Sequence, residues 1–89
     1  MDVKKAHFVW GVANAVLKNN TTMPVSDLVE ILNFNHITTE AFEEYTGGRG
    51  TYHFISQLYK YFVQNDNQEA ADDIAAAFTR PDGSYAYQV

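Results

Sequence analysis

Residues 46–62 read TGGRGTYHFISQLYKYF, and this stretch decides how the rest of the chain is interpreted. Three glycines within four positions disfavour a helix interior, so residues 46–51 are expected to form a loop. After this loop the apolar residues recur with helical spacing on one face: Ile55, Leu58, Tyr59 and Phe62. We therefore expect an amphipathic helix that is capped by Thr51 and ends near residues 65–67.

Two longer helical patterns precede the glycine loop. Residues 3–18 carry apolar side chains at spacings of three and four, and Asp2 is a suitable N-terminal cap. In residues 24–33, Pro24 suits the first turn of a helix. The apolar residues that follow it share one face: Val25, Leu28, Val29 and Leu32. Each pattern predicts a helix with one buried side.

A short third helix, opened by Thr38 or Thr39, is expected between the second helix and the glycine loop. Its apolar members are Ala41, Phe42 and Tyr45, and its exposed members are Glu40, Glu43 and Glu44. The tetrapeptide before it, residues 33–36, contains two asparagines, which accept a left-handed backbone more readily than other non-glycine residues. The second helix is therefore expected to end there.

The C-terminal part of the chain predicts one more helix and an extended tail. Asp66 and Glu69 have the spacing of a capping box, and an alanine-rich pattern continues to Phe78. A turn signal at residues 81–83 follows, and residues 84–89 alternate polar and apolar side chains. This tail is expected to pair with another short extended segment, to lie over the helices, or to add to the sheet edge of a partner.

Composition and length limit the class of protein. The 89 residues predict one all-α domain over 1–89, a small bundle of about five short helices with a short extended C-terminal tail. The chain has no cysteine, which excludes disulfides and thiolate metal sites. The first residues lack a continuous apolar run, so we expect a cytoplasmic protein with no membrane partner. The formal net charge of −5 means that any nucleic-acid contact needs a local basic patch.

The glycine loop is also a candidate anion site. Backbone N–H groups of a glycine-rich loop at a helix N-terminus, together with an arginine and a hydroxyl, are able to hold a phosphate or carboxylate. The residues in question are Gly47, Gly48, Arg49, Gly50 and Thr51, followed along the helix by His53, Gln57 and Lys60. The order of residues is not that of a P-loop, since no lysine follows the last glycine. The alternative is that the glycines only reverse the chain.

Other chemistry has little support in the sequence. The three histidines, His7, His36 and His53, fall on separate elements without the i, i+4 spacing of a metal site. The serines lack the context of a nucleophile. We therefore expect no catalytic residues, no metal and no small-molecule cofactor.

Residues 24–46 have the proportions of a helix-turn-helix unit, with a helix, a brief turn and a second short helix. The segment LNFNHITT, residues 32–39, resembles the turn of helix-turn-helix segments in phage-type regulators and recombinase accessory domains. The resemblance implies a small DNA-binding or nucleoprotein accessory module. However, three glutamates of residues 40–44 stand where such a unit places basic or amide side chains. Residues 47–60 are therefore the better candidate nucleic-acid surface.

A second function is left open beside DNA binding. The chain has more large aromatic residues than a minimal core needs, so some are expected at an interface. Tyr61, Tyr85 and Tyr87 are the candidates for such a surface. On this interpretation the protein is a self-associating protein-interaction module with no nucleic-acid or catalytic role.

Overall fold

Helix α1 (Val3–Lys18) follows the predicted bounds. The computed structural model describes residues 1–88. The Asp2 carboxylate accepts hydrogen bonds from the backbone N–H groups of Lys4 and Lys5, at 2.9 and 3.3 Å, and so caps the first turn. The buried face of α1 consists of Ala6, Val9, Ala13 and Val16. The predicted amphipathic pattern is confirmed for this helix.

Helix α2 (Val25–Phe34) directly follows a two-residue strand, β1 (Met23–Pro24). Its buried residues are the four predicted from spacing: Val25, Leu28, Val29 and Leu32. The left-handed residue after the helix is His36, with φ 57°, and not an asparagine. Because of this turn, the backbone N–H of Ile37 donates to the carbonyl of Leu32 at 2.9 Å, which closes the helix end.

The predicted third helix is not formed, and residues 37–48 are an irregular loop instead. Phe42 adopts φ 61°, a left-handed conformation that an α-helix does not contain. The side chain of Asn33 also binds both backbone groups of Tyr45 and holds that residue outside a helical pattern. Local spacing favoured a helix here, but these contacts with α2 hold the segment as a loop.

Helix α3 (Arg49–Gln64) begins two residues before Thr51, so the predicted cap is wrong. Gly48 precedes the helix without a side-chain cap. Thr51 lies inside the first turn, where it is buried, and its hydroxyl donates to the Thr46 carbonyl. The buried face of α3 includes three of the four predicted residues, Ile55, Leu58 and Phe62, whereas Tyr59 is half-buried.

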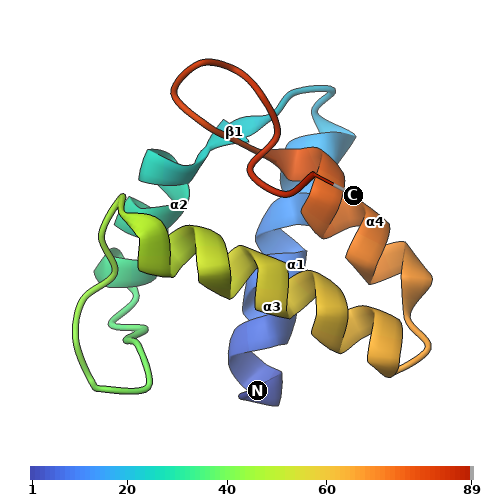
Figure 1. The fold of residues 1–89 in the computed structure, drawn as a ribbon. Coiled ribbons are helices and arrows are strands. Elements are labelled where there is room, and N and C mark those ends of the chain that lie inside the picture. The colour runs from blue at the N-terminus through green and yellow to red at the C-terminus, as the bar shows by residue number, and fades with distance from the viewer. Residues whose placement is uncertain (89) are drawn as a thin grey trace.

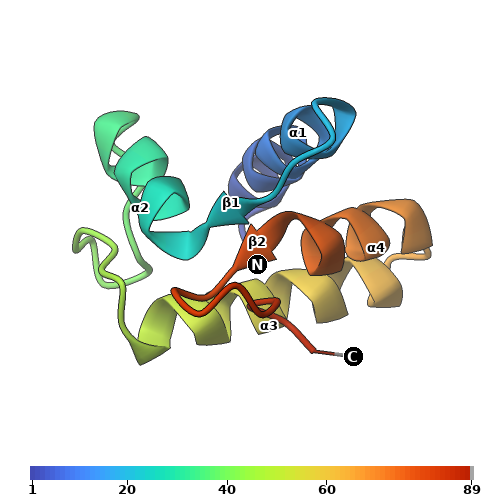
Figure 2. The same ribbon diagram turned by 90° about the horizontal axis from the view of Figure 1, so that it is seen from above.

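Helix α4 (Gln68–Ala77) is capped by Asn67, whose side chain accepts a hydrogen bond from the Ala70 N–H at 3.1 Å. The predicted cap at Asp66 is wrong, because Asp66 takes φ 57° in the preceding turn. The small buried residues Ala70, Ala71 and Ala77 face the core, and α4 lies against both α1 and α3 (Figures 1 and 2). Small side chains let the helices approach closely.

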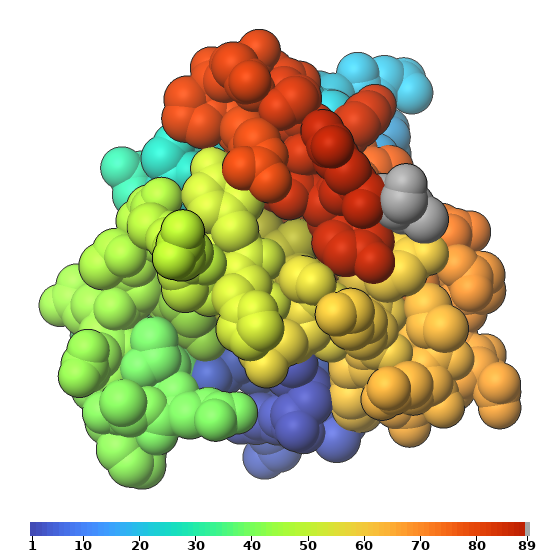
Figure 3. Space-filling view, in the orientation of Figure 1, coloured from blue at the N-terminus to red at the C-terminus, as the bar shows by residue number. Residues whose placement is uncertain are grey.

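The C-terminal segment completes a small sheet that the sequence did not predict. Strand β2 (Phe78–Thr79) pairs in parallel with β1, in the register Met23 with Phe78 and Pro24 with Thr79. The chain then turns back, so that Thr79 bridges Tyr85 in antiparallel fashion. Two of the three expected arrangements are seen together in residues 84–88: one bridge pairs the tail with Thr79, and Tyr87 stacks on Tyr59 of α3, while residue 89 lies outside the described residues. The space-filling view shows the tail lying over α3 (Figure 3).

The described part of the chain, residues 1–88, is mostly helical, with four helices rather than about five. None of these four is long and apolar enough to cross a membrane.

Candidate functional site

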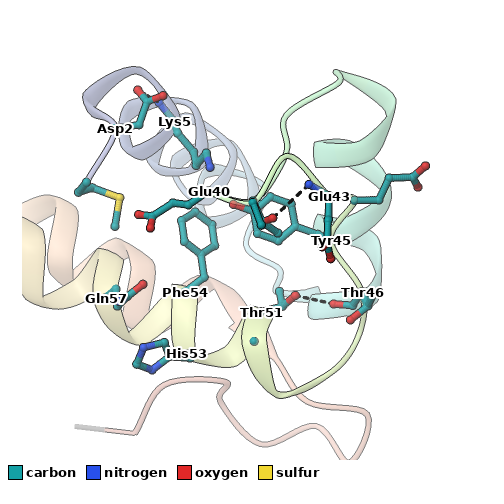
Figure 4. Close-up of a pocket in the computed structure, with 15 residues that line it drawn as sticks. Asp2, Lys5, Glu40, Glu43, Tyr45, Thr46, Thr51, His53, Phe54 and Gln57 are labelled. Carbon is teal, nitrogen blue, oxygen red and sulfur yellow. Dashed lines mark hydrogen bonds between the residues drawn. The ribbon is translucent and has the colours of Figure 1, made fainter.

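A pocket of about 460 Å³ opens between the start of α1, the loop after α2 and the first turns of α3 (Figure 4). Three separate parts of the chain therefore supply its walls. Its lining includes Asp2, Lys5, Glu40, Tyr45, Phe54 and Gln57.

The loop wall of the pocket is held in place by side-chain to backbone bonds. Asn33 donates from Nδ2 to the Tyr45 carbonyl and accepts from the Tyr45 N–H, both at 3.0 Å. Thr39 and Glu43 bind each other twice: the Thr39 N–H donates to the Glu43 carbonyl at 2.9 Å, and the Glu43 N–H donates to Thr39 Oγ1 at 3.2 Å. These bonds fix a segment that has no regular secondary structure.

Lys5 points from α1 into this pocket (Figure 4). Its Nζ lies 5.5 Å from the centre of the Tyr45 ring and 5.7 Å from that of Phe54, within the range of a cation–π contact. The same ammonium donates a hydrogen bond to the Thr38 carbonyl. The two rings lie 5.2 Å apart, so they form one aromatic surface beneath the cation.

Carboxylates outnumber cations around the pocket. Asp2, Glu40, Glu43 and Glu44 line it, whereas Lys5 is the one lysine or arginine among its lining residues. Glu40 and Phe54 both line the pocket, from the loop and from α3 respectively (Figure 4). A local excess of exposed carboxylates attracts cations and repels phosphates, most strongly at low salt. The pocket is therefore suited to a positively charged group.

Two large aromatic side chains, one at the end of α2 and one in the loop that follows, are almost fully exposed. Phe34, the last residue of α2, is 84% exposed, and Phe42, in the loop, is 88% exposed. A bulky residue in a left-handed conformation is uncommon, and Phe42 has φ 61°. The loop thus presents Phe42 to solvent on a strained backbone, next to the residues that line the pocket.

The predicted nucleic-acid residues on α3 share one exposed stripe. Arg49, His53, Gln57 and Lys60 are all exposed, and their spacing of four, four and three residues places them on one side of the helix. His53 and Gln57 line the same pocket as the four carboxylate residues. Lys60 instead lines a second hollow of about 280 Å³, which also contains Glu40. Acidic side chains therefore adjoin much of this stripe.

Two features of the predicted anion loop bear on its role. Gly48 has φ −90°, so it does not need the positive φ that only glycine adopts readily. The Thr51 hydroxyl is buried and already bound to Thr46, so it does not face a ligand in the loop. Gly47, Gly50 and Arg49 are exposed. The loop leads directly into α3.

The three predicted interface tyrosines have different surroundings. Tyr87 stacks on Tyr59 of α3, with ring centres 4.3 Å apart. Tyr61 is half-buried, contacts the Phe62 ring edge to face at 5.2 Å and lines the second hollow. Tyr85 is 51% exposed. Tyr85 is thus the most open of the three.

Sequence patterns did not identify Lys5, Tyr45 and Phe54 as one group. Lys5 and the carbonyl that it binds, Thr38, are 33 positions apart, so no local spacing signals their contact. The available signal was the cluster of three glutamates within residues 40–44. Among residues 1–88, no group of three or more His, Asp or Glu side chains is placed to hold a metal ion.

We compared the chain with models of protein families, with curated proteins and with solved structures, and none of the three comparisons gave a match.

Proposed function

We propose that this protein is a protein-interaction module, and that its pocket binds a basic segment of a partner protein. The observation that carries the proposal is the charge of the pocket: four carboxylate residues line it, Asp2, Glu40, Glu43 and Glu44, against the Lys5 side chain and the amino group of Met1. A lysine or arginine side chain of a partner complements this wall and gains charge-assisted hydrogen bonds there.

The exposed aromatic residues support a protein partner rather than a free cation. Phe34 and Phe42 offer large apolar surfaces whose exposure to water is unfavourable in an isolated protein. Interfaces commonly combine such aromatic anchors with a charged rim. A partner segment with basic and apolar residues would therefore bind both the pocket and these rings.

Self-association is the other protein-interaction possibility. The net charge of −5 opposes the approach of two copies, particularly through the acidic pocket. Tyr85, half exposed on the tail, is the residue most suited to contact a second copy. A dimer seen in solution without added peptide would favour this alternative.

DNA binding by the stripe on α3 is a second candidate function, and it does not depend on the helix-turn-helix resemblance, since the second helix expected within residues 24–46 is a loop. It is supported by the common exposed face of Arg49, His53, Gln57 and Lys60. Only two of these four residues carry a full positive charge at neutral pH. Since each neutralised phosphate contributes about −0.9 to the salt slope, we expect a slope near −2 if this candidate is right.

The test is a fluorescence-anisotropy titration of the full chain at low salt. The probes are a labelled Gly/Ser peptide with three arginines, the same peptide with three glutamates, and a mixed-sequence DNA duplex. We expect binding of the arginine peptide and weaker binding after Glu40→Gln, with Glu30→Gln as the control. Glu30 is exposed on α2 and does not line the pocket, but its replacement changes the net charge equally.

If Glu40→Gln and Glu30→Gln weaken peptide binding equally, the binding depends only on the net charge of the protein, and the pocket proposal is rejected. Binding of the duplex that is lost in Arg49→Ala would favour the DNA candidate instead.

A further inference from the structure

The two aromatic rings that line the pocket, those of Tyr45 and Phe54, are already covered by a cation from the same chain. Lys5 Nζ lies over the Tyr45 and Phe54 rings, at 5.5 and 5.7 Å from their centres, and donates to the Thr38 carbonyl. These three contacts together form an environment that accepts an ammonium group. We infer that this environment is a subsite for an arginine or lysine side chain of the partner, and that Lys5 fills it in the free protein.

Burial explains why the two cations must compete. Tyr45 and Phe54 are only 6% and 8% exposed, and the Lys5 side chain lies over both rings. A partner cation therefore reaches the ring faces only after Lys5 has left them. The Thr38 carbonyl is likewise occupied by Lys5 until that exchange.

Replacement of the Lys5 ammonium by a partner side chain is favoured when that side chain is an arginine. A guanidinium is planar, stacks on aromatic rings and has five N–H donors, whereas an ammonium is a compact and strongly hydrated charge. A guanidinium over Phe54 has enough donors to bind the Thr38 carbonyl and a carboxylate of the pocket, such as that of Glu40. Lys5 is half-buried on the first turns of α1, so its flexible side chain is able to return to water.

This inference rests on the proposed function, and it adds a self-occupied state that weakens partner binding. Removing the Lys5 charge should empty the subsite. Lys5→Met keeps an unbranched side chain and removes the ammonium. Lys4→Met is a matched control, because Lys4 is the adjacent residue of the same helix, is exposed and does not line the pocket.

The first experiment repeats the titration of the full chain with the three-arginine peptide. Lys5→Met should bind about three to five times more tightly than Lys4→Met, which corresponds to one cation–π contact released from competition. If wild type binds and the two variants have equal affinities, the self-occupied subsite is refuted while the proposed function stands. If neither wild type nor any variant binds the peptide, the proposed function itself fails.

The second experiment uses wild type and does not depend on the folding of a variant. Protons of the Lys5 side-chain end should be shifted upfield in NMR spectra by the Tyr45 and Phe54 rings. Saturation with the three-arginine peptide should return them to the positions of the exposed Lys4 protons. Lys5 shifts that stay unchanged at saturation would overturn the inference, since the peptide would then bind elsewhere.

Discussion

Asn33 of α2 and Tyr45 of the loop are joined by two hydrogen bonds of 3.0 Å, one in each direction. This pair anchors one wall of the pocket to a helix. Asn33→Ala leaves both partly buried backbone groups of Tyr45 without their partner, so we expect a loss of about 1–3 kcal/mol in the free energy of unfolding. Urea denaturation measures it. Asn35→Ala is the control: Asn35 binds a carbonyl of its own helix at an exposed site, and its loss should cost about 0.5 kcal/mol or less.

Leu58 is fully buried on α3, as its spacing predicted. Leu58→Ala should lower the free energy of unfolding by about 2–5 kcal/mol, because it removes apolar contacts and leaves a cavity. Its neighbour Gln57 is exposed, and Gln57→Ala should change stability by no more than about 0.5 kcal/mol. Thermal denaturation followed by circular dichroism compares the two. Similar losses in both variants would contradict the packing of this helix.

Tyr85 and Tyr87 differ in their contacts although they lie two residues apart. Tyr87 stacks on Tyr59 at 4.3 Å, whereas Tyr85 is half exposed. Tyr87→Ala should therefore cost more stability than Tyr85→Ala, by about 0.5–1.5 kcal/mol for the aromatic pair. Chemical denaturation provides the comparison, and a larger loss for Tyr85→Ala would place the tail differently.

Glycine-to-alanine substitutions test the backbone conformation at two positions, Gly83 and Gly50. Gly83 has φ +88°, so Gly83→Ala should destabilise the turn by about 1 kcal/mol or more. Gly50 lies in the first turn of α3 with no atom within 4 Å of an added Cβ, so Gly50→Ala should stabilise the protein by up to about 1 kcal/mol. Melting temperatures should therefore move in opposite directions. Two shifts of the same sign would refute the assigned backbone conformations.

The pKa of Asp82 lies below its ordinary value because the Ser84 hydroxyl and the Ser84 N–H both donate to its carboxylate, at 2.6 and 2.9 Å. A lowered pKa in the folded state stabilises the protein above the ordinary carboxyl pKa. This contribution is lost as the pH falls through the lower, folded value. In an NMR titration, Ser84→Ala should raise the Asp82 pKa toward normal. An unchanged value would mean that the Ser84 hydroxyl does not donate to the carboxylate.

Sequence patterns predicted the helices that have a strong periodic face and failed where distant contacts override local preference. The bounds of α1 and the buried face of α2 follow from apolar spacing alone. Residues 38–46 also have plausible helical spacing, but the bonds from Asn33 to Tyr45 hold them as a loop. The spacing of apolar residues cannot predict this contact, because the contact depends on where α2 lies in the folded chain.

The same limit applies to the candidate site. The stripe from Arg49 to Lys60 was predictable because all its members belong to one helix. The pocket was not, because Lys5, Tyr45 and Phe54 come from three segments that meet only after folding. Predicting the parallel pairing of Met23 with Phe78 was equally out of reach, since two-residue strands carry no periodic signal.

The pairing of β1 with β2 also determines when the fold is completed during synthesis. Strand β1 precedes α2, whereas β2 follows α4, so most of the chain lies between the two paired segments. A ribosome must release residue 79 from its exit tunnel before β1 finds its partner. Until then α1 also lacks α4, against which it packs. Stable structure should therefore arise on the nascent chain only after both paired segments have left the tunnel.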